Sequence, residues 1–206
     1  MPRCFRVSGS CLAPLLVLTL IGNGRAIGEG SGAKPAAPAD SASFDLAGGA
    51  LSFEAPAAWK RVMARNRLIE LELAVPGKPA ADTPSGDAPT ARLTIMAAGG
   101  SVDQNLARWI GQFQGTAAGA AREKADIDHR EVAGMPLHTL DIAGTYMDAP
   151  RGPFGPKEAR PDYRMAAAIL ETKGQGTYFF KLVGPGAVVE QNAKEFAAML
   201  DSVEAK

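Results

Sequence analysis

Tyr163-Arg-Met-Ala-Ala-Ala-Ile-Leu-Glu171 and Thr177-Tyr-Phe-Phe-Lys-Leu-Val183 are apolar on both faces, a pattern typical of central strands that are covered on both sides. Between them, Thr172-Lys-Gly-Gln-Gly176 has the glycines that a hairpin turn requires. After Gly184-Pro185-Gly186, apolar residues recur at spacings of four and three from Val189 to Val203. This period predicts a closing helix whose apolar stripe packs on the sheet.

The rest of the chain adds strands and one more helix to this unit. Ser101, with Gln104 three residues later, fits a capping box, and an apolar face follows from Val102 to Phe113 with Gly115 as the expected end. The pattern predicts an α+β fold, in which helices cover an antiparallel β-sheet. The expected strands are Leu51–Glu54, Trp59–Met63, Leu68–Val75, Ala91–Ala97, Ala125–Val132 and Met135–Ala143.

The N-terminus is typical of a secretory signal peptide. Arg3 and Arg6 precede the apolar run from Leu12 to Ile21, and small residues follow up to Ala26. We therefore expect residues 1–26 to be a signal peptide, 27–43 a disordered linker rich in Gly, Ala, Ser and Pro, and 44–206 a single globular domain. An uncleaved anchor is the alternative for the first segment.

Charge and cysteine usage exclude several classes of protein. The sequence has 22 basic and 22 acidic residues. Because Arg3, Arg6 and Arg25 lie in the expected signal peptide, cleavage would leave an acidic excess of three, so we expect no nucleic-acid partner. Both cysteines, Cys4 and Cys11, lie in that same segment, so the mature chain would have no disulfide, thiolate metal site or cysteine nucleophile.

Two short segments suggest a family resemblance. Leu51-Ser-Phe-Glu-Ala-Pro-Ala-Ala-Trp59 lies near the start of the expected domain, and Tyr178-Phe-Phe-Lys-Leu-Val-Gly-Pro185 leads into Phe196-Ala-Ala-Met-Leu-Asp-Ser202. From about residue 44 to 203, the chain resembles the fold shared by the extrinsic lumenal PsbP protein of photosystem II and the Ran-binding Mog proteins. The resemblance implies an α/β/α sandwich around an antiparallel sheet, and an accessory or binding role. No Ran-binding or manganese-related residue of that family can be matched to a position here.

The residues that could carry catalysis are sparse. His138 shares strand parity with Leu140 and Ile142, which predicts a histidine that points to a helix-covered face. A metal site from His129, His138 and a carboxylate would require the hairpin to align the two rings, and we expect no metal and no cofactor. Glu70 and Glu72 share one face of a strand and are interpreted as a solvated edge.

Two proline-rich segments, Pro76–Thr90 and Thr145–Asp162, are predicted to be long loops. The second also carries aromatic and basic side chains, the chemistry of recognition surfaces. We therefore expect this loop, with the start of the next strand, to bind an unknown protein or small ligand. The expected binding residues are Tyr146, Arg151, Phe154, Arg160 and Arg164.

The sequence thus favours an exported, non-catalytic binding or accessory domain, periplasmic or extracellular, with no membrane span once the signal peptide is cleaved. Two alternatives remain open. One is a secreted hydrolase-type enzyme whose site combines Tyr146, Arg164 and His138, with His129 as the other candidate histidine. The other is a structural protein held at the membrane by its uncleaved N-terminal segment.

Overall fold

The computed structural model describes residues 40–78, 88–114, 125–150, 152 and 155–206. All of them belong to one unit, Pro35–Lys206. The expected signal peptide and most of the expected linker lie outside the described residues and stay predictions. Strand structure begins at Ser41, N-terminal to the predicted domain start at Phe44. Among the described helices, none is long and apolar enough to cross a membrane.

An eight-stranded antiparallel sheet forms the centre of the unit. Its order is β3-β4-β5-β10-β9-β8-β6, and β7 also pairs with β8. The two strands quoted first, β9 and β10, lie next to each other inside this order, as their apolar faces predict. The bounds are β3 Lys60–Arg61, β4 Leu71–Pro76, β5 Thr90–Ala98, β6 Phe113–Gln114, β7 Asp126–Val132, β8 Met135–Asp148, β9 Glu158–Glu171 and β10 Thr177–Pro185.

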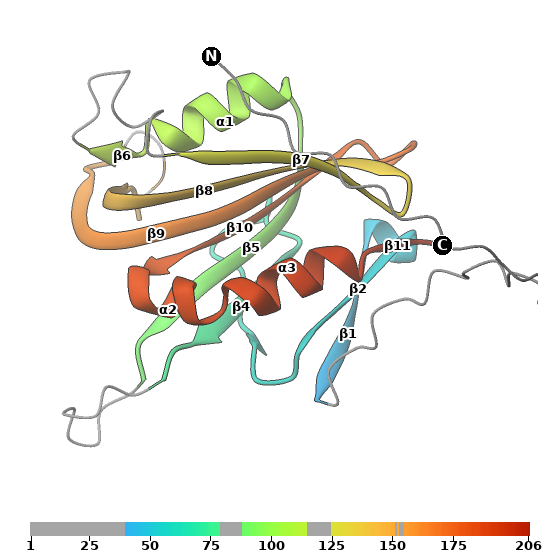
Figure 1. Cartoon of the computed structure of the whole chain (residues 1–206), viewed down its shortest axis with the longest axis horizontal. Coiled ribbons are helices and arrows are strands. Elements are labelled where there is room, and N and C mark those ends of the chain that lie inside the picture. Colours follow the sequence, from blue (N-terminus) through green and yellow to red (C-terminus); the bar gives the residue numbers. More distant parts are fainter. Residues whose placement is uncertain (1–39, 79–87, 115–124, 151, 153–154) are drawn as a thin grey trace, which may run out of the picture. The chain divides into compact units, whose positions relative to one another are not determined.

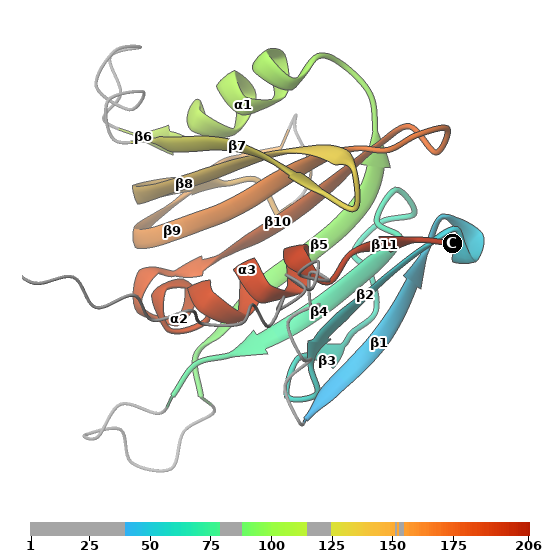
Figure 2. The ribbon, with the colours of Figure 1, turned by 45° about the vertical axis from the view of Figure 1, so that its right-hand side comes forward.

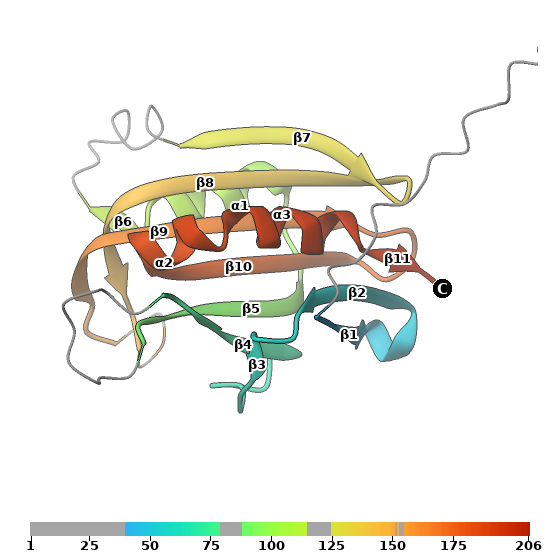
Figure 3. The same ribbon diagram turned by 60° about the horizontal axis from the view of Figure 1, so that its bottom comes forward.

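Helices cover both faces of this sheet (Figure 1). Helix α1, Val102–Ile110, packs on one face, and its Ser101 side chain accepts a hydrogen bond from the backbone of Gln104, as the capping pattern predicts. Helices α2, Gly186–Gln191, and α3, Ala193–Asp201, lie on the opposite face over β9 and β10 (Figure 3). Helix α1 ends at its C-cap Gly111, before the Gly115 that the sequence suggested.

A second, three-stranded sheet joins the two ends of the described unit (Figure 2). Its order is β1-β2-β11, with β1 Ser41–Leu46, β2 Leu51–Pro56 and β11 Glu204–Ala205. The turn between β1 and β2 includes the 3-10 helix η1, Ala47–Gly49. Side chains of β2 share the apolar core between the large sheet and α3. The predicted antiparallel sheet with helical cover is confirmed, while the α/β/α description fits in part, since strands dominate and this sheet lies outside it.

Asn192 divides the predicted closing helix into α2 and α3. Its buried side chain accepts a hydrogen bond from Trp59 Nε1 at 3.1 Å and donates to the backbone oxygens of Pro76 and Val188. These bonds connect the helix pair with β4 and with the loop after β2. The apolar period continues across the break, so Phe196 and Leu200 are buried as predicted.

Both ends of the predicted loop from Thr145 to Asp162 are strand, so the prediction was wrong for these parts of it. Strand β8 continues to Asp148, and β9 already begins at Glu158. Proline has no backbone N–H to donate to a neighbouring strand. Pro161 is tolerated in β9 because β10 ends opposite Tyr163, so no β10 carbonyl lies opposite Pro161. A register shift between Gly144 and Tyr146 accommodates the bend in β8.

The interpretation of Glu70 and Glu72 as solvated was wrong for Glu72, whereas Glu70 is exposed. Glu72 is 3% exposed, because the side chains of Arg65 and Arg92 lie against its carboxylate. Glu70 accepts hydrogen bonds from the backbone N–H of Ala47 and from the Tyr178 hydroxyl. The Glu70 carboxylate and burial together raise the pKa of Tyr178 to about 12, with burial the larger cause.

Candidate functional site

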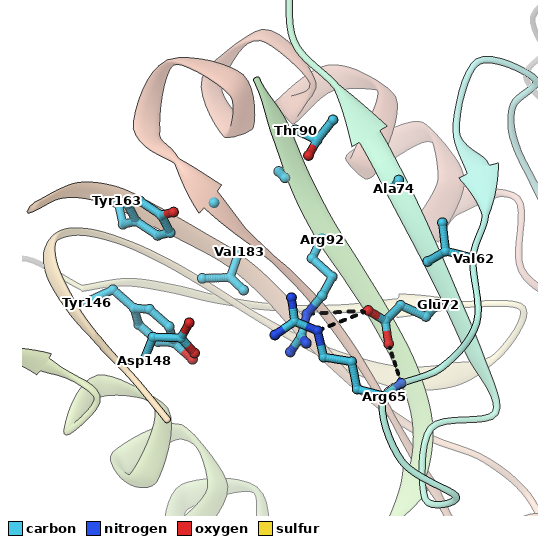
Figure 4. Close-up of a pocket in the computed structure, with 12 residues that line it drawn as sticks. Val62, Arg65, Glu72, Ala74, Thr90, Arg92, Tyr146, Asp148, Tyr163 and Val183 are labelled. Atoms are coloured by element: carbon cyan, nitrogen blue, oxygen red, sulfur yellow. Dashed lines mark hydrogen bonds and ion pairs between the residues drawn. The ribbon is translucent and has the colours of Figure 1, made fainter. Parts of the chain in front are cut away.

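The candidate site is a cavity of about 250 Å³ on the face of the sheet that carries α1. Helix α1 packs over the β8–β9 side of this face, and no other described helix lies on it. Among the described elements, the β4–β5 side of this face therefore has no helical cover, while α2 and α3 lie on the opposite face (Figure 1). The cavity opens there, and its side chains come from five strands and the β3–β4 loop (Figure 4). The lining residues are Val62, Arg65, Glu72, Ala74, Thr90, Ala91, Arg92, Tyr146, Asp148, Tyr163, Val183 and Gly184.

One wall of the cavity carries two arginines that share one carboxylate. Glu72 Oε1 lies 3.9 Å from Arg65 Nε and 3.7 Å from Arg92 Nε, and Glu72 Oε2 accepts a hydrogen bond from the backbone N–H of Arg65. The Arg92 side chain is 31% exposed and that of Arg65 is 55% exposed. Among the described residues, neither guanidinium has a further ion-pair partner, so donors on both remain available to a ligand.

The opposite wall carries two phenol rings and a carboxylate. Tyr146 and Asp148 come from the end of β8, and Tyr163 comes from β9. The Tyr146 and Tyr163 rings are parallel, with centroids 6.2 Å apart, and Tyr146 also packs against Phe113. Figure 4 shows Asp148 across the cavity from the two guanidinium groups, and no ion pair joins it to them. Opposite charges therefore face each other across the cavity.

Lys181 lies beside this wall in the middle of β10. Its Nζ donates to Gln112 Oε1 at 2.6 Å and lies 3.4 Å from the Tyr146 hydroxyl. Burial lowers the pKa of Lys181 to about 7, with Arg92 and Arg108 adding to the effect and Asp148 opposing it. Burial, with a smaller contribution from Asp148, raises the pKa of Tyr146. A buried amine with a lowered pKa therefore lies next to the cavity wall, beside Tyr146.

A second cavity of about 370 Å³ adjoins the first. It shares Arg65, Arg92 and Asp148 with it and is otherwise lined by Asn66 and by Ala149, Pro150 and Gly152 of the β8–β9 connection. The same two guanidinium groups therefore border both spaces. The connection predicted to carry recognition residues thus reaches the site through its first residues.

The structure brings few of the predicted binding residues together. Tyr146 lines the cavity but is 7% exposed, so its ring is a packed wall and not an exposed anchor. Arg160 lies opposite Tyr146 in the β8–β9 register and pairs with Glu158. Arg164 is directed to the other face, where it pairs with Asp141 and with Glu190 of α2. Arg151 and Phe154 lie outside the described residues.

The residues proposed for a hydrolase are also separated. His138 and Tyr146 are eight residues apart on β8, which corresponds to about 26 Å along an extended strand. His138 contacts His129 and Glu171, whereas Tyr146 contacts Lys181. With Arg164 on the opposite face, the described structure holds no shared cleft of these three residues.

A larger cavity, about 490 Å³, lies between β1 and β4, but both of its carboxylates are engaged. Glu70 is bonded to Ala47 and Tyr178, and Asp45 pairs with Lys206. The cavity beside Arg65 and Arg92 is the better candidate, because two guanidinium groups on one wall face the carboxylate of Asp148 on the other.

No family model matches the chain, and no curated protein matches its sequence. The solved structures that match include cyanobacterial PsbP (CyanoP) from Synechocystis sp. PCC 6803, with 12% identity over 87% of this chain and 99% of that chain, at a TM-score of 0.48. A protein of unknown function from Pseudomonas aeruginosa, PA94, matches with 11% identity over 81% of this chain and 97% of that chain, at a TM-score of 0.40.

The resemblance to the PsbP fold that the sequence suggested is confirmed at the level of the fold. The Mog resemblance stays a prediction. Both TM-scores are below 0.5, so neither likeness bears on the ligand, the partner or the chemistry of this chain.

Proposed function

We propose that this chain is an exported, non-catalytic binding domain whose ligand is a small molecule with an anionic group. The anionic group, a carboxylate or phosphate, contacts the guanidinium groups of Arg65 and Arg92. A hydroxyl or amine of the same molecule donates to Asp148. The observation that carries the proposal is the pair of arginines that share the single carboxylate of Glu72 at the wall of a cavity.

Charge geometry supports this ligand class. Guanidinium groups form short, charge-assisted hydrogen bonds to carboxylate and phosphate oxygens. Glu72 is buried beneath the two arginines and holds them in place, while Asp148 stands across the cavity. A ligand with an anionic group at one end and a donor at the other complements both walls. Apolar side chains of Val62 and Val183 provide the remaining contact surface.

The size of the site favours a small molecule. Ligand pockets typically measure about 300–1,000 Å³ and orient their ligand with a few placed polar groups. The 250 Å³ cavity, with the adjoining 370 Å³ space, lies in this range.

A binding role accounts for the site better than hydrolysis does, because His138, Tyr146 and Arg164 do not converge. Export follows from the tripartite N-terminal sequence, and membrane anchoring by an uncleaved segment is the alternative for that part of the proposal.

The test is a thermal-shift and calorimetric screen of the full chain against small carboxylates, phosphates and amino acids. A ligand that binds the folded state raises the melting temperature in proportion to the logarithm of its concentration. The expected result is a carboxylate- or phosphate-bearing ligand whose affinity falls at least about tenfold in Arg65→Gln, the loss of one charge-assisted contact.

Arg67→Gln is the matched control, because Arg67 is exposed on the same loop and does not line the cavity. Equal affinity in the wild type, Arg65→Gln and Asp148→Asn would place the ligand elsewhere and overturn the proposal. Hydrolysis of a bound ester or phosphate would show that the domain is catalytic and would overturn that part of the proposal.

A further inference from the structure

The two histidines of the chain meet on one hairpin. The β7–β8 turn is formed by Ala133 and Gly134, both with positive φ, as a two-residue hairpin of the primed type requires. This turn fixes a register in which His129 lies directly opposite His138. The sequence showed that such an alignment was needed for a metal site, and the structure has it.

The ring nitrogens of this pair converge. The two Nδ1 atoms are 2.7 Å apart, and the ring planes are inclined at 75°. On its other side, His138 Nε2 lies 2.8 Å from Glu171 Oε1, on the end of β9. His129 is exposed and the His138 side chain is 18% exposed, so solvent reaches the pair.

Glu171 determines which nitrogen of His138 carries a lone pair. A carboxylate accepts hydrogen bonds, so His138 Nε2 donates its proton to Glu171, and in the neutral ring Nδ1 is then the acceptor. His129 Nδ1 supplies the proton that lies between the rings. If that proton moves to Nε2 of His129, both Nδ1 atoms present lone pairs to the same point. No proton leaves the protein in this exchange.

We propose that His129 and His138 form a two-imidazole binding site for Cu²⁺, with Glu171 as the positioning residue. Hydrogen bonding of a ligand histidine to a carboxylate is the common outer-shell arrangement of metal sites, and it fixes both tautomer and ring orientation. Because the described residues offer no group of three His, Cys, Asp or Glu ligands, water or an external ligand completes the coordination.

Geometry favours copper over zinc. Two nitrogens at about 2.0–2.1 Å from one metal are about 2.8–3.0 Å apart at a right angle, but about 3.3–3.4 Å apart at the tetrahedral angle. The observed 2.7 Å needs a small opening for the square-planar arrangement that Cu²⁺ prefers and a larger one for tetrahedral Zn²⁺. Copper also forms the most stable complexes of the divalent first-row metals with nitrogen ligands.

The test uses the full chain with Cys4→Ser and Cys11→Ser, which removes competing thiols. Titration with Cu²⁺ at pH 8, followed by calorimetry and electron paramagnetic resonance, should show one tight site with two nitrogen ligands. Zn²⁺ should bind at least tenfold more weakly.

Since the chain has two histidines in total, imidazole signals can arise from this pair alone. Nuclear magnetic resonance of the unmutated rings should show both broadened by substoichiometric Cu²⁺.

His129→Asn should abolish the two-nitrogen spectrum, and it leaves the fold intact because His129 is exposed on β7. Glu171→Gln should weaken Cu²⁺ binding about 10–100-fold and alter the spectrum, without a change in melting temperature. Asp128→Asn, next to His129 but on the other side of the strand, is the matched control and should bind Cu²⁺ as the wild type does. An unchanged spectrum in His129→Asn, or rings that Cu²⁺ leaves sharp, would overturn the proposal.

Discussion

The Lys181 amine is buried, and burial disfavours its charged form. Its folded-state pKa of about 7 lies below the value of about 10.4 for an unfolded chain. Between these two values the unfolded chain binds more protons than the folded one. The free energy of unfolding therefore rises with pH from about 7 to about 10, and at or below pH 7 the buried ammonium lowers it by its full amount.

Lys181→Met should therefore stabilise the protein near pH 6–7 and lose this advantage as the pH approaches 10. Methionine keeps the length of the side chain and removes the charge, and replacing a buried ion by an apolar group of similar size is often stabilising. Melting curves of both proteins from pH 6 to pH 10 check this. Lys173→Met, on the turn before β10, is the control and should show no such trend. A difference in stability that is constant over the whole range would show that Lys181 does not lose its proton on folding.

Glu72 shows why residue-level reasoning failed at the site. Its strand parity was predicted correctly, but parity does not reveal whether a face is wet or covered. The partners of Glu72 are Arg65 of the β3–β4 loop and Arg92 of β5. The sequence predicted the strands but not which residues of neighbouring strands lie opposite each other, so these contacts could not be predicted. One usable signal was in the sequence: a lysine within the apolar run of β10 marks a polar place in the core.

At the level of elements, Asn192 connects the closing helices with β4 and with the loop after β2. Asn192→Ala removes three side-chain hydrogen bonds and leaves Trp59 Nε1 without its partner. Unsatisfied buried polar groups cost about 1–3 kcal/mol each, so we expect the free energy of unfolding to fall by roughly 2–4 kcal/mol. Chemical denaturation measures this value.

Lys194→Ala is the control for Asn192→Ala, because Lys194 is exposed in the first turn of α3 and should change stability by less than about 0.5 kcal/mol. Equal effects of the two substitutions would show that α2 and α3 do not depend on the bonds of Asn192.

Elements with a local signal were predictable, and those that depend on distant partners were not. Neighbouring residues are enough to predict three features: the cap at Ser101, the turn at Ala133-Gly134 and the apolar strands β9 and β10. The long β8–β9 pair could not be predicted in this way, because prolines such as Pro161 indicate a loop. Only the position where β10 ends shows that a strand can contain Pro161. The break at Asn192 likewise depends on Trp59, far away in sequence.

For the whole molecule, we expect the exported protein to begin near Ile27. The basic, apolar and small-residue order of residues 1–26 is the reason, and the first described strand begins well after that point, at Ser41. N-terminal sequencing of the protein recovered from the periplasm or medium checks the prediction. Met1 or Pro2 at the start of the exported protein would contradict cleavage and support the membrane-anchored alternative.

The three-stranded sheet combines the first strands of the described domain with its last strand. Strand β11 pairs with β2, and the Ser202 hydroxyl accepts a hydrogen bond from the backbone of Glu54, 148 residues earlier. During synthesis, β2 is complete long before β11, so one edge of β2 has no strand partner until the last residues of the domain are made. Contacts of such sequence separation form late. The three-stranded sheet can therefore be completed only after residues up to Ala205 have been synthesised, so the last residues of the domain close a sheet that the first ones begin.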